Sequence, residues 1–136
     1  MENDDVEILT RRQIKPTAIR LLILKAMMQF EEAFCLYDLE VYLDTVDKST
    51  IFRTISLFLE KHLIHAIDDG SGSLKYAICN DLDDFHYHFH CLKCNKTFCL
   101  HHVEVPPISL PPDFKIESIN YVIKGICAAC GRKEKK

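Results

Sequence analysis

The feature that most constrains this chain is a pair of Cys-x-x-Cys motifs that lie far apart in the sequence. The first is Cys91 and Cys94, and the second is Cys127 and Cys130. Thiolates at this spacing can bind one tetrahedral cation, and two such pairs complete a four-cysteine zinc site. Such a closed structural site would hold the segment around the second motif against the strand before the first. The alternative is two redox-active pairs or disulfides.

Three histidines take alternate positions just before the first motif. They are His86, His88 and His90. Side chains on a β-strand alternate between its faces, so a strand here would point all three imidazoles to one face. The sequence therefore predicts that a second, more open metal site uses this face.

Composition narrows the class of protein. The chain has seven cysteines, and its acidic first five residues contain no apolar signal segment, which predicts a cytoplasmic protein that binds metal through thiolates. No apolar run has membrane-spanning length. The formal net charge of −3 at pH 7 argues against a broadly basic domain. A DNA-binding surface would therefore need a local basic patch, for which Arg12, Lys15 and Arg20 are candidates.

The first 80 residues have the pattern of a winged helix-turn-helix. Apolar residues recur at helical spacing in three segments, and a Gly-rich turn over residues 68–73 separates two short apolar segments typical of a β-hairpin. A frayed tail with a short helix is expected over residues 1–14. The further expected elements are a helix after the capping residue Thr17, a short helix over Leu36–Leu43, a helix over Thr50–His62 capped by Ser49, and strands over Leu63–Ile67 and Leu74–Cys79.

The helix expected over Thr50–His62 carries a candidate DNA-reading face. Thr50, Phe52, Arg53 and Ser56 fall on one side of it. An arginine can bind guanine or phosphate, and a phenylalanine can contact a thymine methyl group. The alternative is that Phe52 packs on a neighbouring helix and Arg53 is simply solvated. The opposite side is expected to be buried and consists of Ile51, Ile55, Phe58, Leu59 and His62.

An acidic polar segment near residue 80 is the expected boundary between two domains. We place a DNA-binding domain at residues 1–80, a hinge at 81–84 and a metal-binding dimerisation domain at 85–136. A three-stranded sheet has an open edge that a second copy can cover, so a homodimer is expected. The predicted fold class is α+β, a winged helix-turn-helix followed by a small α/β domain. Its strands are expected over Phe85–His90, Lys96–His102 and Phe114–Lys124, with a disordered tail from Arg132.

Taken in order, these segments resemble the ferric uptake regulator superfamily of metal-dependent transcription regulators. Lys15–Arg20 looks like the start of the family's first helix, and Ser49–Thr54 is similar to its recognition-helix motif, A-T-V-Y-R-T. The His-x-His-x-x-Cys-x-x-Cys motif and the second Cys-x-x-Cys look like its metal signatures. The resemblance covers roughly residues 10–131 and is nearest to the zinc-sensing branch.

The resemblance implies a metal-activated regulator, expected to be a repressor, that binds an inverted-repeat DNA operator as a homodimer. It implies a structural zinc on the four cysteines and a regulatory metal at the hinge. The implied DNA-binding residues are Arg12, Lys15, Arg20, Ser49, Thr50, Phe52 and Arg53.

The implied regulatory ligands depart from the iron-sensor pattern. His86 and His88 match the family's strand histidines, Cys79 resembles a zinc-sensor cysteine, and His65 stands where some zinc sensors have aspartate. Cys99 replaces a carboxylate of the iron sensors and would lie opposite His88 on an antiparallel hairpin, so it is a rival ligand. Thiolate and imidazole ligands favour Zn(II) over Fe(II).

Other interpretations remain open. The alternative for Cys79 and Cys99 is a small buried apolar side chain, and for His65 a solvated strand residue. His90, His101 and His102 have no assigned role. The alternative function is an Fe(II) or peroxide sensor of the same superfamily. Zinc storage, zinc delivery and zinc hydrolysis are further alternatives, although no His-Glu-x-x-His motif is present.

Overall fold

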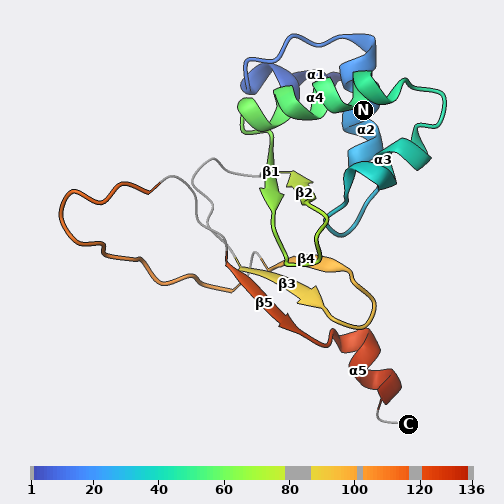
Figure 1. The fold of residues 1–136 in the computed structure, drawn as a ribbon. Coiled ribbons are helices and arrows are strands. Elements are labelled where there is room, and N and C mark those ends of the chain that lie inside the picture. The colour runs from blue at the N-terminus through green and yellow to red at the C-terminus, as the bar shows by residue number, and fades with distance from the viewer. Residues whose placement is uncertain (1, 79–86, 101–102, 117–120, 135–136) are drawn as a thin grey trace.

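The computed structural model describes residues 2–78, 87–100, 103–116 and 121–134. Helices and a small hairpin form the helical part (residues 2–78), and a second sheet with a short helix forms the sheet part (residues 87–134) (Figure 1). Within the described residues, no helix combines the length and apolar character that a membrane crossing requires.

The four helices of the helical part share one apolar core. They are α1 (Glu2–Arg11), α2 (Ala18–Met27), α3 (Leu36–Tyr42) and α4 (Lys48–Glu60). Leu9, Ile23, Leu39 and Phe58, one from each helix, are fully buried in that core. Residues 1–14 were expected to be a frayed tail with a short helix, but α1 is a regular helix because Leu9 is buried in the shared core.

Sequence periodicity located the helices better than it located their ends. Thr17 caps α2 as predicted, since its Oγ1 accepts the Arg20 N–H at 3.2 Å. The prediction that Ser49 caps the next helix was wrong: Asp47 is the N-cap, and Ser49 lies in the first turn of α4. The prediction that His62 is buried was also wrong, because α4 ends at Glu60 and His62 is exposed.

The hairpin after α4 confirms the winged-helix arrangement. Strands β1 (Ile64–Ile67) and β2 (Lys75–Ile78) are antiparallel, with His65 opposite Ala77. We call β1, β2 and the turn between them the wing. Gly70 in this turn has φ of 83°, a backbone conformation that glycine adopts without strain. The wing extends from the helices toward the second sheet (Figure 1).

The sheet part contains the predicted three-stranded sheet. Its strands are β3 (Tyr87–Cys91), β4 (Thr97–Leu100) and β5 (Val122–Gly125), in the order β4-β3-β5. β4 is antiparallel to β3, whereas β5 is parallel to it. The tail predicted to be disordered from Arg132 instead continues helix α5 (Ala128–Glu134). The predicted domain boundary and hinge fall within residues 79–86, outside the described residues.

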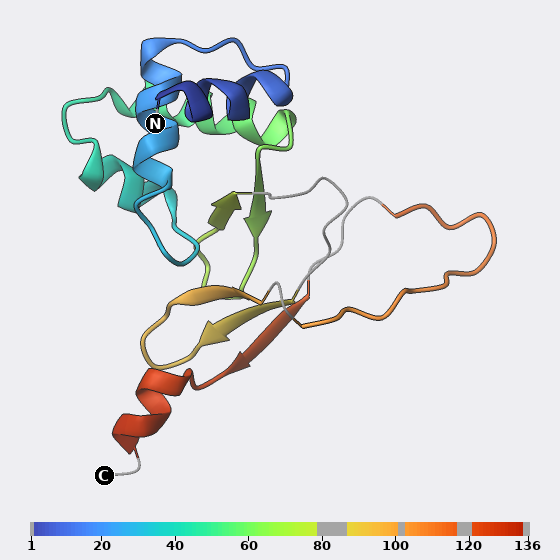
Figure 2. The same ribbon diagram turned by 180° about the vertical axis from the view of Figure 1, so that it is seen from behind.

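Seen from behind, the wing lies between the helices and the β4–β3 side of the second sheet (Figure 2). A backbone hydrogen bond crosses this junction from the Ala33 N–H, between α2 and α3, to the Thr97 carbonyl at 3.0 Å. The Pro-rich segment 103–116 extends away from the helices and from the second sheet, and it contains no helix or strand (Figure 2). The prediction that the third strand begins at Phe114 was therefore wrong, since β5 begins at Val122. The wing and the α2–α3 connection therefore bring the helical part onto the second sheet.

Candidate metal centres and DNA-binding surface

The four cysteines of the two Cys-x-x-Cys motifs converge in the structure. Cys91 ends β3, Cys94 lies in the following turn, Cys127 precedes α5, and Cys130 lies in α5. Their sulfur atoms all lie within 4.8 Å of one another. The parallel pairing of β3 and β5 explains this convergence, because it sets Cys91 beside Gly125 and so delivers the second motif to the first.

Backbone amides make this cluster suitable for thiolates. The Cys94 and Cys127 N–H groups donate to the Cys91 Sγ at 3.5 Å and 3.4 Å. The first of these bonds, assisted by the second, lowers the pKa of the Cys91 thiol to about 6. Hydrogen bonding with Cys127, followed by burial, raises the pKa of Cys130 to about 12, and the charge of Cys127 adds the smallest contribution. A divalent cation would offset this charge, so the donor set fits Zn(II).

Among the described cysteines no disulfide is formed, and Cys94 and Cys127 approach to 3.8 Å between sulfur atoms. This spacing is that of thiolates around a common centre rather than of bonded sulfurs. The arrangement favours the predicted metal site over the alternative of disulfides.

A second cluster joins the wing to the second sheet. It consists of His65 from β1, His88 from β3 and Cys99 from β4, whose ligand atoms all lie within 4.8 Å of one another. The two Nε2 atoms are 3.1 Å apart. His88 and Cys99 are direct cross-strand partners, as the sequence predicted, and His88 is buried. Two imidazoles and a thiol are a donor set that suits Zn(II) and leaves a position for a further ligand.

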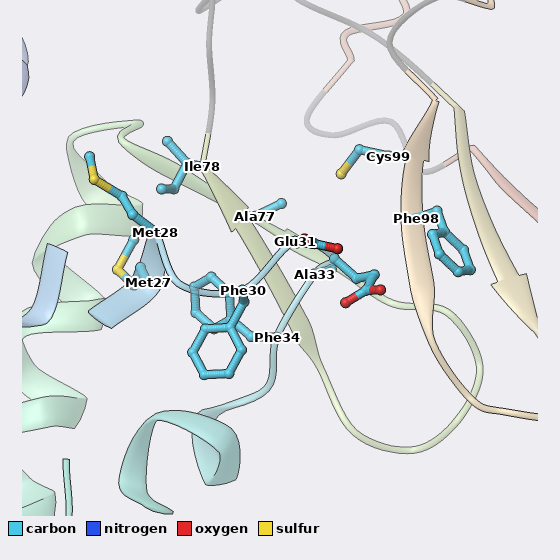
Figure 3. Close-up of a pocket in the computed structure, with 11 residues that line it drawn as sticks. Met27, Met28, Phe30, Glu31, Ala33, Phe34, Ala77, Ile78, Phe98 and Cys99 are labelled. Atoms are coloured by element: carbon cyan, nitrogen blue, oxygen red, sulfur yellow. The ribbon is translucent and has the colours of Figure 1, made fainter. Parts of the chain in front are cut away.

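A cavity of about 360 Å³ lies beside this cluster, between the end of α2 and strand β4. The sulfur of Cys99 points toward this cavity from β4, and Ala33 and Ala77 line its other side (Figure 3). The cavity therefore has small apolar residues on one wall and a thiol on the opposite wall.

Of the remaining histidines and cysteines considered as metal ligands, the structure describes only His90. Cys79, His86, His101 and His102 lie outside the described residues. His90 is buried, but its Nδ1 lies 3.0 Å from the Thr97 Oγ1 and 3.3 Å from an Asp69 carboxylate oxygen. Its ring is thus engaged with the wing turn instead of the His65–His88–Cys99 cluster.

Sequence reasoning missed Asp69 and Thr97. The sequence pattern places Asp69 only within the Gly-rich turn over residues 68–73, yet Asp69 is 1% exposed and accepts a hydrogen bond from the Thr97 Oγ1 at 2.6 Å. A turn residue that contacts a strand 28 positions later leaves no local signal in the sequence. Only the three-dimensional placement of the wing shows this contact.

The predicted DNA-reading face of α4 is exposed. Phe52 is 59% exposed, which contradicts the alternative that it packs on a neighbouring helix. Arg53 is exposed beside it, and its Nη2 donates to the Thr50 Oγ1 at 3.4 Å. Ser49 is exposed one turn earlier. An aromatic ring and a guanidinium group side by side on an exposed helix can contact base edges in a major groove.

The predicted basic patch lies at the start of α2. Lys15 is exposed, whereas Arg12 and Arg20 are half-buried. The Arg20 Nη1 donates to the Lys15 carbonyl at 2.9 Å, which holds the guanidinium group against the turn before α2. The patch can supply the phosphate contacts that position a protein on a duplex.

Comparison with known proteins agrees with these features. The profile of the Ferric uptake regulator family matches residues 11–110. The ferric uptake regulation protein of Bacillus subtilis (strain 168) is 30% identical over 107 residues, which cover 70% of this chain and 71% of that protein. The structure of a zinc uptake regulator complexed with zinc and DNA is 21% identical, with a TM-score of 0.70 over 98% of this chain and 95% of that one. The Vibrio cholerae ferric uptake regulator gives a TM-score of 0.64 at 16% identity, over 91% of this chain and 100% of that one.

Proposed function

Because this chain belongs to the ferric uptake regulator family of metal-responsive transcription regulators, we propose that it is a Zn(II)-activated repressor of genes for metal homeostasis. In this proposal, a structural zinc occupies the four-cysteine cluster and a second zinc occupies the regulatory centre. We use the name regulatory centre for the cluster of His65, His88 and Cys99. Cys79 and His86 are proposed as further ligands of the same zinc. The single observation that carries the proposal is the convergence of His65, His88 and Cys99 from the wing and the second sheet.

The donor set supports zinc as the regulatory metal. The described ligands offer two imidazole nitrogens and one sulfur, whereas Fe(II) and Mn(II) sites generally use more oxygen ligands and six positions. A second cysteine from Cys79 would strengthen this preference. Bound zinc would supply a strong, directional link between its ligands.

Activation follows from where the ligands lie. His65 belongs to the wing, which is continuous with α4, and His88 and Cys99 belong to the second sheet. A cation held by both fixes the orientation of the helical part relative to the sheet part. Zinc then favours the DNA-competent arrangement because it binds that arrangement more tightly than others.

The proposed DNA target is an inverted repeat bound by a homodimer. Two copies of α4 would enter successive major grooves, whose half-sites are about one helical turn apart. The described exposed surface of the sheet part is apolar enough for a second copy to cover. Its large exposed apolar side chains, among the described residues, are Leu92, Val103, Ile108, Leu110, Phe114, Ile116, Ile123 and Ile126.

The test is the metal dependence of DNA retention. Protein that holds only the structural zinc is incubated with an inverted-repeat operator library and titrated separately with buffered Zn(II) and anoxic Fe(II). Retention at far lower free Zn(II) than free Fe(II) is expected. Preferential activation by Fe(II) would indicate an iron-type regulator, and no retention with either metal would contradict the proposed role of α4.

A further inference from the structure

A carboxylate of the wing turn is buried against the second sheet. Asp69 is 1% exposed, and its Oδ2 accepts hydrogen bonds from the Thr97 Oγ1 at 2.6 Å and the Lys75 Nζ at 2.9 Å. The His90 Nδ1 lies 3.3 Å from the same oxygen. The Oδ1 accepts the Ser71 N–H at 3.0 Å. Two of these groups belong to the wing itself, but Thr97 and His90 belong to the sheet part.

Thr97 connects this carboxylate to a second segment of the helical part. Its side chain is completely buried, and its backbone carbonyl accepts the Ala33 N–H from the α2–α3 connection at 3.0 Å. A single residue of β4 thus holds both the wing turn and the connection that precedes α3. These contacts exist without any metal ligand taking part.

The polar cluster and the regulatory centre are neighbours on the same ladder. His90 pairs with Thr97 across β3 and β4, and His88 pairs with Cys99 in the same register. Residues two apart on a strand share a face, so these two cross-strand pairs lie side by side. The wing places Asp69 on the first pair and His65 on the second.

We propose that Asp69 and Thr97 form a metal-independent latch that positions the wing so that His65 stands opposite His88 and Cys99. Both are positioning residues: neither binds the cation, but together they set how much reorganisation the regulatory centre needs before zinc can bind. This proposal rests on the proposed function, because it assigns a role to residues around the same centre.

The physical chemistry of Asp69 supports a stable latch. Burial alone would raise the pKa of this carboxyl, but hydrogen bonds from Ser71, Thr97 and Lys75 outweigh burial and hold its pKa well below the ordinary range. If the Asp69–Thr97 contact opened in the folded protein, the buried side chains of Thr97 and His90 would lose hydrogen-bond partners, which costs free energy. A latch that favours this arrangement without metal lowers the ordering cost of zinc binding, and bound zinc then shifts the protein further toward the same arrangement.

The test compares Thr97→Val, which removes the hydroxyl group at nearly constant volume, with Thr97→Ser, which retains it. The affinity for the second zinc is measured by chelator competition in full-length protein that already holds the structural zinc. Thr97→Val is expected to weaken the second zinc by about 10-fold to 100-fold, the usual effect of removing a group that orients metal ligands. Thr97→Ser is expected to stay close to wild type.

A second readout does not depend on the regulatory metal. Hydrogen exchange of the Ala33 amide reports whether the sheet part holds the helical part before zinc binds. We expect slow exchange in wild type and at least about 10-fold faster exchange in Thr97→Val. If Thr97→Val does not fold, Asp69→Asn provides the same test from the wing. The control is Lys96→Ala, which breaks the Lys96–Glu32 ion pair at 3.6 Å, a pair that is more exposed than the Asp69–Thr97 contact.

The outcomes separate the two proposals. If wild type binds no second zinc, the proposed function fails and the positioning role fails with it. If wild type binds a second zinc but Thr97→Val and Asp69→Asn leave its affinity unchanged, only the positioning role is overturned. Fast exchange of the Ala33 amide in wild type would also overturn the latch, whatever the zinc affinity.

Discussion

The two candidate metal clusters of this chain offer similar ligand types, and they differ in which elements supply the ligands. The four-cysteine cluster is built within the sheet part, from the end of β3, its following turn and the region of α5. The His65–His88–Cys99 cluster takes one ligand from the wing and two from the second sheet. A site within one part can stabilise that part, whereas a site that joins two parts can also change their relative orientation.

The two clusters also differ in the charge that their ligands carry when they bind a metal. Four cysteine thiolates fill a tetrahedron, and a divalent cation balances part of their charge. The described ligands of the second cluster include two imidazoles, which bind metal in their neutral form. The comparison predicts a zinc that is permanently bound in the first cluster and exchangeable in the second.

The largest effect is expected from breaking the four-cysteine cluster. Cys127→Ser should remove the structural zinc and release α5 from β3, since zinc at such sites contributes roughly 10 kcal/mol or more to folding. Zinc content and thermal unfolding of the purified chain measure this. Cys35→Ser is the matched control, because Cys35 caps α3 away from both clusters and serine is a good capping residue.

Next in size is the loss of the thiol in the regulatory centre. Cys99→Ser should raise the free Zn(II) needed for operator binding by about 100-fold, or roughly 2.7 kcal/mol, while the structural zinc stays bound. Operator binding across zinc buffers gives the shift. An unchanged zinc requirement would show that Cys99 only lines the neighbouring cavity.

A change on α4 should affect DNA without affecting metal. Arg53→Ala is expected to weaken operator binding by about 1–3 kcal/mol, whereas both zinc affinities stay at their wild-type values. Ser56→Ala is the control on the same exposed side of the helix. Equal weakening by both substitutions would count against a specific contact by Arg53.

The smallest effect concerns the pH dependence of the latch. The pKa of Asp69 is lowered in the folded protein, so its contribution to stability is present above its unfolded pKa of about 3.8 and declines as the pH falls below it. Asp69→Asn should lower the free energy of unfolding by about 1–3 kcal/mol at pH 7, and the difference from wild type should shrink below pH 4. Denaturant unfolding at a series of pH values measures it, and a difference that grows on acidification would contradict the sign.

The structural features that depend on local sequence patterns could be predicted from the sequence. Strand alternation and antiparallel pairing predicted that Cys99 would stand opposite His88, and the register confirms it. The exposure of Phe52 and Arg53 followed from helical spacing in the same way.

Features that depend on packing between segments distant in the sequence could not be predicted from the sequence alone. Asp69 reaches Thr97 only because the wing lies on the second sheet. The helix at Arg132 and the cap at Asp47 in place of Ser49 were also missed, since neighbouring residues offered equally good local choices. His65 could be placed near His88 only through a resemblance, because two hairpins separated by a linker have no fixed register.

The central claim is that a cation joins the wing to the second sheet, and the most direct test removes the wing ligand alone. Operator binding is measured against free Zn(II) for His65→Asn and for His62→Asn, the second being an exposed histidine just before β1. Asparagine also tolerates the left-handed backbone at position 62, where φ is 60°. We expect His65→Asn to raise the free Zn(II) required for operator binding by about 100-fold and His62→Asn to leave it unchanged. Identical zinc dependence in both variants and wild type would contradict it.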